Sequence, residues 1–518
     1  MLNTIKNTYR LTKAGAMLAW HGASFVPESV TLPGPLRVLR GTGEDEPAAK
    51  RKEKAERLSN AIRALGPTYI KLGQFMATRP DVVGPQLANA LGLLRDRLPP
   101  FPVSEAHREI EAAFGKPWNE IYEEFGPPLA AASIAQVHKA MVKTPMGPRA
   151  VAVKILRPHI EKRFERDLES FYFAAHTVER FSPQTRRLRP VAAVDTLAQS
   201  VVLEMDLRLE AAAISEIAEN IAKGGDTGFR VPKVDWERTG KRVLTIDWID
   251  GIPLGDLEAI DRAGLDRRAL GLNVIRSFLK HAIRDGFFHA DMHQGNLFAD
   301  PKDGSLVAVD FGIMGRLRPK ESRFLAEILY GFITKNYQRA AEIHFEAGYV
   351  PSTQSVAAFA QSLRAIGEPI MGRPSEEISM ARLLTQLFEN TEVFQMRMRP
   401  ELLLLQKTMV VAEGVARSLD PKLNIWMAAE PVVREWLTNQ LGPRAQLKDM
   451  AQNVNALATA LKQAPHLIER GAKIVDTLEA EKAEREEETS SDTSLAIALP
   501  LWIGMAALIV IAAKQFLG

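Results

Sequence analysis

The pattern of hydrophobic and polar positions divides the chain into a helical beginning, a strand-rich middle and a long helical second half. Helical spacing occurs over 50–65, 68–76, 103–125, 160–223 and 316–478, and strand-like alternation occurs over 128–155, 231–234 and 243–249. Ser104 is the predicted N-cap of the third helical stretch. The order of the elements predicts an α+β chain with a small strand-rich lobe before a large helical lobe.

The C-terminal pattern differs in kind from the rest of the chain. Residues 495–513 carry no charge over nineteen positions, a length that spans about 28 Å as a helix, close to the hydrocarbon thickness of a bilayer. The preceding residues 479–494 are charged and then rich in Ser and Thr, which is typical of a solvated tether. We therefore predict a C-terminal transmembrane helix, with a buried core helix as the alternative.

The N-terminal stretch from Lys6 to Val26 combines basic residues with an apolar run that His21 and Gly22 interrupt. Two interpretations are open: an amphipathic helix that rests on a membrane surface, and an ordinary packed helix. Residues 27–50 follow as a Pro- and Gly-rich linker.

Composition narrows the classes of function. The 518 residues are 46% hydrophobic and 25% charged, as in ordinary globular proteins. A net charge of +3 gives no support for a nucleic-acid partner, so none is predicted. The complete lack of cysteine excludes disulfides, cysteine-ligated zinc and thiol catalysis.

The most informative motif pairs Asp291 and Asn296, five residues apart, with Asp310-Phe311-Gly312 fourteen residues after the Asn. Turn residues at 300–304 and an apolar run at 306–309 predict a hairpin that brings the two parts together. Phosphoryl transfer needs such a set, because its main requirements are positioning and charge neutralisation. Asp291 is the candidate base, and Asn296 and Asp310 are candidate Mg²⁺ ligands beside the phosphates of ATP or ADP.

A kinase-type site also needs a strand lysine paired with a glutamate on the helix behind it. Lys154, in Val-Ala-Val-Lys, fits the first role, and Glu204 and Glu210 are candidates for the second, of which Glu210 is preferred. The place of the glycine-rich phosphate loop is instead rich in alanine, which predicts a stiffer loop and argues against an ordinary protein kinase. The candidate nucleotide-binding residues there are Ala130, Ala131, Ala132, Ser133, Ile134 and Val137.

These motifs, with Lys71-Leu72-Gly73-Gln74 and Glu204-Met205-Asp206, make the chain resemble the UbiB (ADCK-like) family of atypical kinases over roughly residues 55–320. The resemblance implies that Lys71, Gly73 and Gln74 lie on a helical extension folded over the active site. This extension would lie near Glu204 and Asp206, where it would block a protein substrate and restrain autophosphorylation. It further implies ubiquinone biosynthesis, with polyprenyl-phenol intermediates, membrane lipid and other enzymes of that process as partners. The catalytic domain is expected on the cytoplasmic side of the inner membrane.

The predicted organisation is a protein-kinase-like two-lobe fold with an N-terminal helical extension and a C-terminal anchor. Its segments are 1–50 (amphipathic helix and linker), 51–125 (extension), 126–250 (N-lobe), 251–478 (C-lobe), 479–494 (tether) and 495–513 (span). The predicted function is a membrane-anchored ATPase or atypical kinase. Two alternatives stay open: a conventional protein or small-molecule kinase, and a lipid-binding scaffold that uses nucleotide as a switch.

Overall fold

The computed structural model describes residues 2–20, 48–77, 79, 83, 85–92, 94, 98–181, 186, 189–371, 393–396 and 400–441. The chain divides into two compact units, Met1–Leu437 and Thr438–Gly518, and the first of them contains nearly all of the described residues. Among the described helices, none combines the length and the hydrophobicity that crossing a bilayer requires. The predicted span at 495–513 lies outside the described residues.

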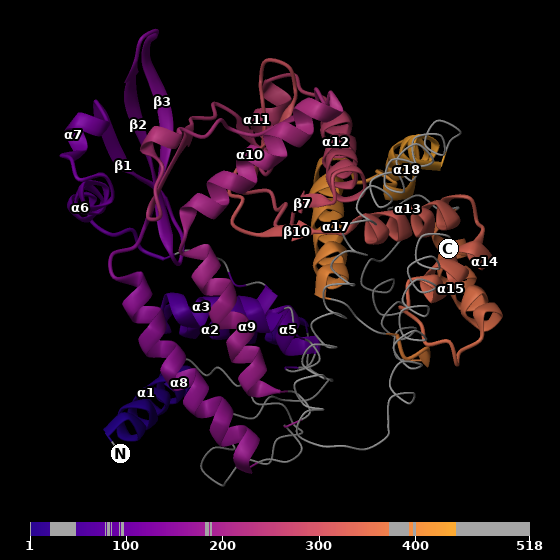
Figure 1. Ribbon diagram of the computed structural model, residues 1–518, viewed down its shortest axis with the longest axis horizontal. Helices are drawn as coiled ribbons and strands as arrows, with labels where there is room; N and C mark the ends of the chain where they lie inside the picture. The colour runs from indigo at the N-terminus through magenta and orange to yellow at the C-terminus, as the bar shows by residue number, and fades with distance from the viewer. Residues whose placement is uncertain are drawn as a thin grey trace, which may run out of the picture. The chain divides into compact units, whose positions relative to one another are not determined.

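A four-stranded antiparallel sheet in the order β1-β2-β3-β5 forms the strand-rich lobe (Figure 1). Its strands are β1 (Glu124–Ala131), β2 (Ala135–Thr144), β3 (Gly147–Leu156) and β5 (Val243–Asp247). Helices α6 (Val103–Phe114) and α7 (Trp118–Ile121) pack against it through a core that includes Ile110, Tyr122 and Val153.

The prediction of one helix over 103–125 is wrong. Gly115 takes the left-handed conformation with φ +67° and closes α6, and Pro117 starts the short α7. A glycine followed by a proline is a common helix stop, because the glycine reaches positive φ and the proline cannot continue the hydrogen-bonding pattern. The predicted N-cap is also wrong, since Pro102 occupies that position and Ser104 lies inside the helix.

Helices from the beginning of the first unit gather around α8 (Ile160–Phe181) and α9 (Pro190–Glu204), which lie side by side. They are α1 (Leu2–Trp20), α2 (Ala48–Leu65), α3 (Pro67–Ala77) and α5 (Pro85–Gly92). Their own core contains Leu58, Ile62, Ile70 and Leu91. This group is the helical extension, and it surrounds the helix that carries Lys71.

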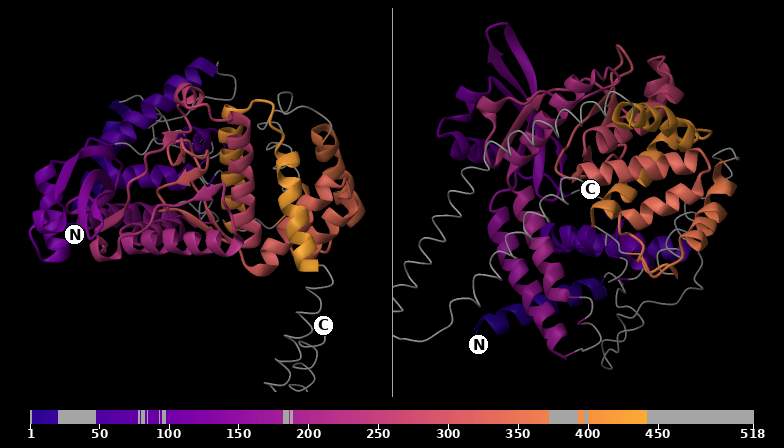
Figure 2. Two further views of the ribbon diagram at one scale, coloured as in Figure 1. Left: turned by 90° about the horizontal axis from the view of Figure 1, so that it is seen from above. Right: turned by 45° about the vertical axis from the view of Figure 1, so that its right-hand side comes forward.

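The helical lobe is built on α12 (Arg267–Leu279) and α17 (Pro400–Leu419), which contact each other and lie side by side in the left view of Figure 2. Around this pair are α10 (Leu207–Gly224), α11 (Leu257–Arg262), α13 (Pro319–Ile333), α14 (Tyr337–Glu346), α15 (Val356–Met371), α18 (Ile425–Leu441) and the short helix η4 (Lys280–Arg284). The short helix η3 (Trp236–Arg238) instead contacts β5 of the strand-rich lobe. Large buried side chains such as Phe278, Phe288 and Phe311 fill its core.

Two small sheets in this lobe position the motif residues. One pairs β7 (Phe287–His289) with β10 (Met314–Arg316), and the other has the order β4-β9-β8-β6. Its strands are β4 (Phe229–Arg230), β9 (Leu306–Ala308), β8 (Leu297–Ala299) and β6 (Ile252–Pro253). The antiparallel register of Leu297 with Ala308 and Ala299 with Leu306 confirms the predicted hairpin between Asn296 and Asp310.

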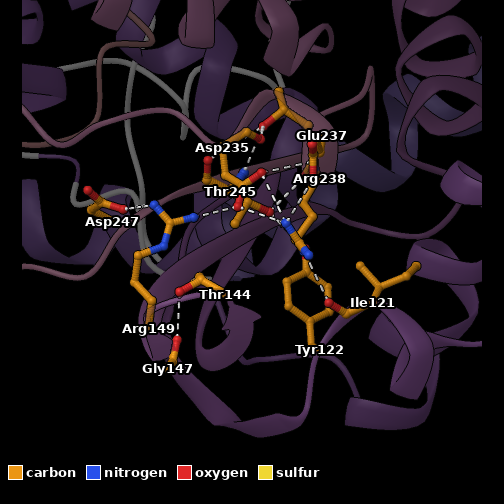
Figure 3. A network of polar contacts seen from close by, with 11 residues as sticks. Ile121, Tyr122, Thr144, Gly147, Arg149, Asp235, Glu237, Arg238, Thr245 and Asp247 are labelled. Carbon is orange, nitrogen blue, oxygen red and sulfur yellow. Dashed lines mark hydrogen bonds and ion pairs between the residues drawn. The ribbon is translucent and has the colours of Figure 1, made fainter.

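A polar network joins β3, β5 and η3 away from the motifs (Figure 3). The buried carboxylate of Asp235 binds Arg149 at 2.6 Å and Arg238 at 3.1 Å, and Arg149 also binds Asp247 at 2.6 Å. The hydroxyl of Tyr122 lies 2.7 Å from that of Thr245, whose own hydroxyl donates to the carbonyl of Arg238. The network therefore fastens the sheet to the segment that follows β4.

Acid is expected to destabilise the fold through His281 in η4. This side chain is 1% exposed, and burial lowers its pKa from 6.5 to about 4. The unfolded chain therefore binds more protons than the folded one between these values, so stability is full above pH 6.5 and falls as pH approaches 4. At pH 5 the loss from this residue is roughly 2 kcal/mol.

We expect the urea midpoint to drop less between pH 7.5 and 5 in His281→Phe than in the unmodified chain. His176→Phe, at an exposed position of α8, is the control; an equal drop in all three proteins would contradict the expectation.

Candidate active site

Strand β3 carries Lys154 to the middle of the site. The pairing of Lys154 with Val137 on β2 and with Leu244 on β5 places it between two apolar neighbours. Its ammonium lies 2.9 Å from both carboxylate oxygens of Glu210 and 2.9 Å from Oδ1 of Asp310. The structure thus brings Lys154 into contact with Glu210 and Asp310, which lie 56 and 156 positions later in the chain.

Helix α10 places Glu210 in its first turn. Asp206 is the N-cap, and its side chain accepts from the backbone N–H of Arg208 at 3.1 Å. One turn later the Glu210 side chain is 7% exposed, and it accepts the Phe311 backbone N–H at 3.2 Å. Glu210 therefore holds both the strand lysine and the backbone that follows Asp310. Of the two glutamates considered for this role, Glu210 is the one in contact with Lys154.

The electrostatics of these three groups are strongly coupled. Burial alone would lower the pKa of Lys154, but the charges of Asp310 and Glu210 outweigh it and raise that pKa. Burial acts against ionisation of Asp310 as well, yet the Lys154 ammonium holds its pKa well below the usual range. For Glu210 burial prevails over Lys154 and raises the pKa. Asp310 is thus the persistent anion of the site, and 49% of its side chain is open to solvent.

Asp310 itself has an unusual backbone conformation, with φ +60°. Such left-handed geometry is uncommon outside glycine, and Asp tolerates it better than most residues because its short side chain can bond locally. Here Oδ1 accepts the Gly312 N–H at 3.4 Å. The turn directs the carboxylate toward Lys154, while Phe311, one residue on, is 1% exposed in the core.

The loop after β7 carries Asp291 and Asn296. The Asn296 amide donates to the backbone carbonyl of Asp291 at 3.1 Å and lies 3.5 Å from its Oδ2. The backbone carbonyl of Asn296 accepts the Val309 N–H at 2.9 Å, and this bond connects the loop to the strand that leads to Asp310. Thr408 on α17 adds a hydrogen bond to the carbonyl of Ala290 at 3.1 Å. All three predicted polar residues of the two motifs are therefore held on one hydrogen-bonded framework.

Two histidines beside Asp291 have defined tautomers. Nδ1 of His289 accepts the Asp291 N–H at 3.0 Å, which leaves the proton on Nε2, near the Val309 carbonyl. Nδ1 of His293 accepts the Gly295 N–H at 3.0 Å, so its Nε2–H faces the Asp291 carboxylate at 3.5 Å. Burial lowers the pKa of His289, which keeps that ring neutral.

The predicted alanine-rich loop is shorter than the sequence suggested. Ala130 and Ala131 are the last residues of β1, paired with Val137 and Gln136, so they belong to the sheet and not to a loop. Only residues 132–134 form the turn, which the Ala132 N–H closes by donating to the Ala135 carbonyl at 2.8 Å. The strand can continue through Ala130 and Ala131 because alanine, unlike glycine, rarely takes positive φ.

Hydrogen bonds from residues outside the turn also hold it in place. The guanidinium of Arg157 donates to the Ala132 carbonyl at 2.8 and 3.0 Å and to the Pro99 carbonyl at 2.9 Å. The Leu98 N–H donates to the Ala131 carbonyl at 3.3 Å. Ser133 and Ile134, two of the candidate nucleotide-binding residues, are 0% and 8% exposed. Both side chains are buried in this conformation, and their contact with a nucleotide stays a prediction.

Arg157→Met is expected to loosen this turn. Without the three N–H donors of the guanidinium, the Ala132–Ala135 hydrogen bond opens more often, and amide hydrogen exchange over residues 131–135 should rise about tenfold. Exchange measured by mass spectrometry on peptides from this segment would test it. Arg262→Met, at an exposed site on α11, should leave the rate unchanged; an equal rate in both variants would show that Arg157 does not hold the turn.

The extension meets α9 through the side chain of Lys71. Lys71 forms an ion pair with Glu204, and their side chains are only 10% and 14% exposed. Gly73 permits close packing of α3, because a Cβ there would lie 2.5 Å from the Leu94 side chain. Gln74 is half-buried on the same helix, whereas Asp206 faces Arg208 at 2.6 Å. The structure thus joins Lys71 to the last residue of α9, which only Met205 and Asp206 separate from the start of α10.

The oxygen donors of Asn296 and Asp310 suit Mg²⁺ shared with nucleotide phosphates better than a metal ion held by protein side chains alone. Within the described residues no group of three or more His, Asp or Glu side chains could enclose a metal ion. Mg²⁺ in nucleotide sites takes one or two carboxylates and completes its shell with phosphate and water oxygens. Asn296 and the half-exposed Asp310 carboxylate fit that requirement.

Sequence reasoning missed several residues that shape the site. Arg157 and Thr408 act through backbone carbonyls far away in the chain, and nothing in their local sequence signals this. His289 and His293 lie two residues on either side of Asp291, but their roles as acceptors of backbone N–H groups follow only from the loop geometry.

Together these contacts define a kinase-like site. In agreement with this, a model of the ABC1 atypical kinase-like domain matches residues 93–344, and a model of the UbiB helical domain matches residues 363–424. The probable protein kinase UbiB of Marinobacter nauticus is 38% identical over 450 residues, which cover 86% of this chain and 80% of that protein. The protein of the same name from Aliivibrio salmonicida is 34% identical over 468 residues, 90% of this chain and 85% of its own. The chain therefore belongs to the UbiB family of atypical kinase-like proteins.

A solved structure shares this fold. It is the complex of a Mycobacterium tuberculosis protein with erythromycin, 26% identical in sequence, with a TM-score of 0.53. The similarity covers 74% of this chain and 97% of that one.

Proposed function

We propose that this protein is a membrane-anchored atypical kinase or ATPase that supports ubiquinone biosynthesis. It would use Mg²⁺-ATP hydrolysis to act on polyprenyl-phenol intermediates, or to give access to them for the enzymes that process them. The observation that carries the proposal is the ion-paired set of Lys154, Glu210 and Asp310, next to the Asp291–Asn296 loop. The names of its relatives support the kinase class, and the family supports the link to ubiquinone.

Each residue has a defined task in this proposal. Lys154, fixed by Glu210, would orient the nucleotide phosphates. Asn296 and Asp310 would hold Mg²⁺, which neutralises phosphate charge when it is bound. Asp291 would orient the attacking water or hydroxyl, with the Nε2–H of His293 facing the same carboxylate.

The extension would restrain the site. Lys71, Gly73 and Gln74 on α3 would act on Glu204 and, through the α9–α10 junction, on Asp206 and the helix of Glu210. The fastened alanine turn would limit how nucleotide enters and would set the preference between ATP and ADP. Residues 495–513 would anchor the chain in the inner membrane, with the catalytic domain on the cytoplasmic side.

The test is ATP hydrolysis by the full chain in vesicles, with and without a phenol that mimics the ring of the intermediate. Turnover that requires Mg²⁺ and rises with phenol is expected. A phosphorylated product in place of free phosphate would favour a conventional kinase. Nucleotide binding with no turnover under any condition would overturn the proposal in favour of a nucleotide-switched scaffold.

A further inference from the structure

The outward face of α1 carries an apolar stripe. Ile5 is 67% exposed, Tyr9 is 69% exposed and Trp20 is 89% exposed, and Ala16 between them is exposed too. These positions are spaced by four, seven and four residues, so at 3.6 residues per turn they fall on one side of the helix. Exposure of a tryptophan, a tyrosine and an isoleucine along one line is unfavourable in water, and such an apolar surface commonly marks an interaction site.

The opposite face of α1 is fixed to the protein. Asn7 is 8% exposed and accepts a hydrogen bond from the Ser170 hydroxyl at 3.2 Å. Arg10 donates to the Arg166 carbonyl at 3.0 Å and lies 3.5 Å from the Glu169 carboxylate. Ser170, Arg166 and Glu169 all belong to α8, against which α1 lies in Figure 1. The helix cannot rotate its stripe inward without breaking these contacts.

Charge on α1 is of one sign. Its nineteen residues contain Lys6, Arg10 and Lys13 and no acidic residue. Arg10 is engaged with α8, whereas Lys6 and Lys13 are exposed and border the stripe three residues before and four residues after Tyr9. An aromatic and aliphatic stripe edged by lysines has the composition of helices that lie in the interface of an anionic bilayer. A second copy of this face would bring lysine against lysine, which makes self-association the weaker explanation.

We propose that α1 lies in the surface of an anionic lipid bilayer. Ile5, Tyr9 and Trp20 would enter the headgroup region, and Lys6 and Lys13 would pair with lipid phosphates. This contact is separate from the C-terminal segment and does not depend on ATP turnover. Helix α1 and the Lys71 helix α3 both pack on α8, so binding of α1 to a bilayer would act on the group of helices that contains the Lys71–Glu204 ion pair.

The absence of cysteine from the whole sequence makes a local test possible. The full chain with Tyr9→Cys is labelled with an environment-sensitive thiol fluorophore and mixed with vesicles of phosphatidylcholine alone or with added phosphatidylglycerol. The expected result is a blue shift and brighter emission only with the anionic vesicles. Thr8→Cys, exposed on the same helix but off the stripe, is the matched control and should change little.

Charge reversal tests the lysines separately. In the labelled Tyr9→Cys chain, Lys6→Glu with Lys13→Glu should reduce the response to anionic vesicles to the level seen with phosphatidylcholine. Lys116→Glu with Lys143→Glu makes the same change in net charge at exposed positions of the strand-rich lobe, and it should keep the response.

Three results would overturn the proposal. One is no change at Tyr9 with anionic vesicles. Another is an equal change at Thr8. The third is a change without lipid that grows with protein concentration, which would assign the face to a second copy of the chain. ATP turnover is measured in the same samples, so a lipid response without turnover would reject the proposed activity and leave the α1 contact standing.

Discussion

Asp310→Asn is expected to reduce Mg²⁺-ATP turnover by about a hundredfold or more, because electrostatic positioning of phosphate and metal carries most of phosphoryl-transfer catalysis. The substitution removes the persistent anion of the site but keeps its shape. It also leaves Lys154 with Glu210 as its single carboxylate partner among the contacts described here. Phosphate release at saturating ATP and Mg²⁺ is the measurement.

Asp303→Asn is the matched control for this experiment. It makes the same chemical change in the turn of the same hairpin, where Asp303 accepts the Ser305 N–H at 2.8 Å, a role that asparagine can fill. Its turnover should stay within twofold of the unmodified chain. If Asp310→Asn retained activity within tenfold, the assignment of Asp310 to the metal would be wrong.

Asp235→Ala should destabilise the protein by about 3 kcal/mol, because it removes the buried carboxylate that two arginines share and leaves their charges without this partner. The Asp235 side chain is 5% exposed, and it serves both Arg149 and Arg238 (Figure 3). Both arginines keep some contact with water, at 34% and 22% exposure, so the expected loss is near the lower end of what such changes cause. The measurement is the free energy of unfolding from urea denaturation.

Glu237→Ala provides the comparison for this stability change. Glu237 contacts the same Arg238 at 3.6 Å, but its side chain is 89% exposed. Exposed pairs of this kind contribute at most about 1 kcal/mol. A loss for Asp235→Ala no larger than that for Glu237→Ala would mean that the network does not stabilise the lobe.

The strands and contacts nearest the motifs could be predicted from sequence. Alternation over 151–155 gave the strand of Lys154, and the turn residues at 300–304 gave the β8–β9 hairpin. These succeeded because strand periodicity and turn chemistry are local properties. The contact between Lys154 and Glu210 followed from the requirement of a kinase-type site for a strand lysine paired with a glutamate on the helix behind it.

The errors have two physical causes. One was local but overlooked: Gly115 and Pro117 divide the predicted helix, and Ala130 and Ala131 follow the strand alternation over 128–155 and belong to β1, not to the alanine-rich loop. The other cannot be read locally at all. Thr408 supports the loop of Asp291 from 118 residues away, and only the packing of α17 on α12 brings it there.

The double pairing of Lys154 has a practical consequence for chemical probing. Amine-directed reagents attack the neutral amine, and two carboxylates at 2.9 Å raise the pKa of this ammonium and keep it protonated. In the arrangement seen here Lys154, whose side chain is 16% exposed, should be one of the least reactive lysines of the chain. A change in its acylation rate, followed by mass spectrometry, would then act as a footprint of whether Asp310 still faces it, without any need to know the substrate.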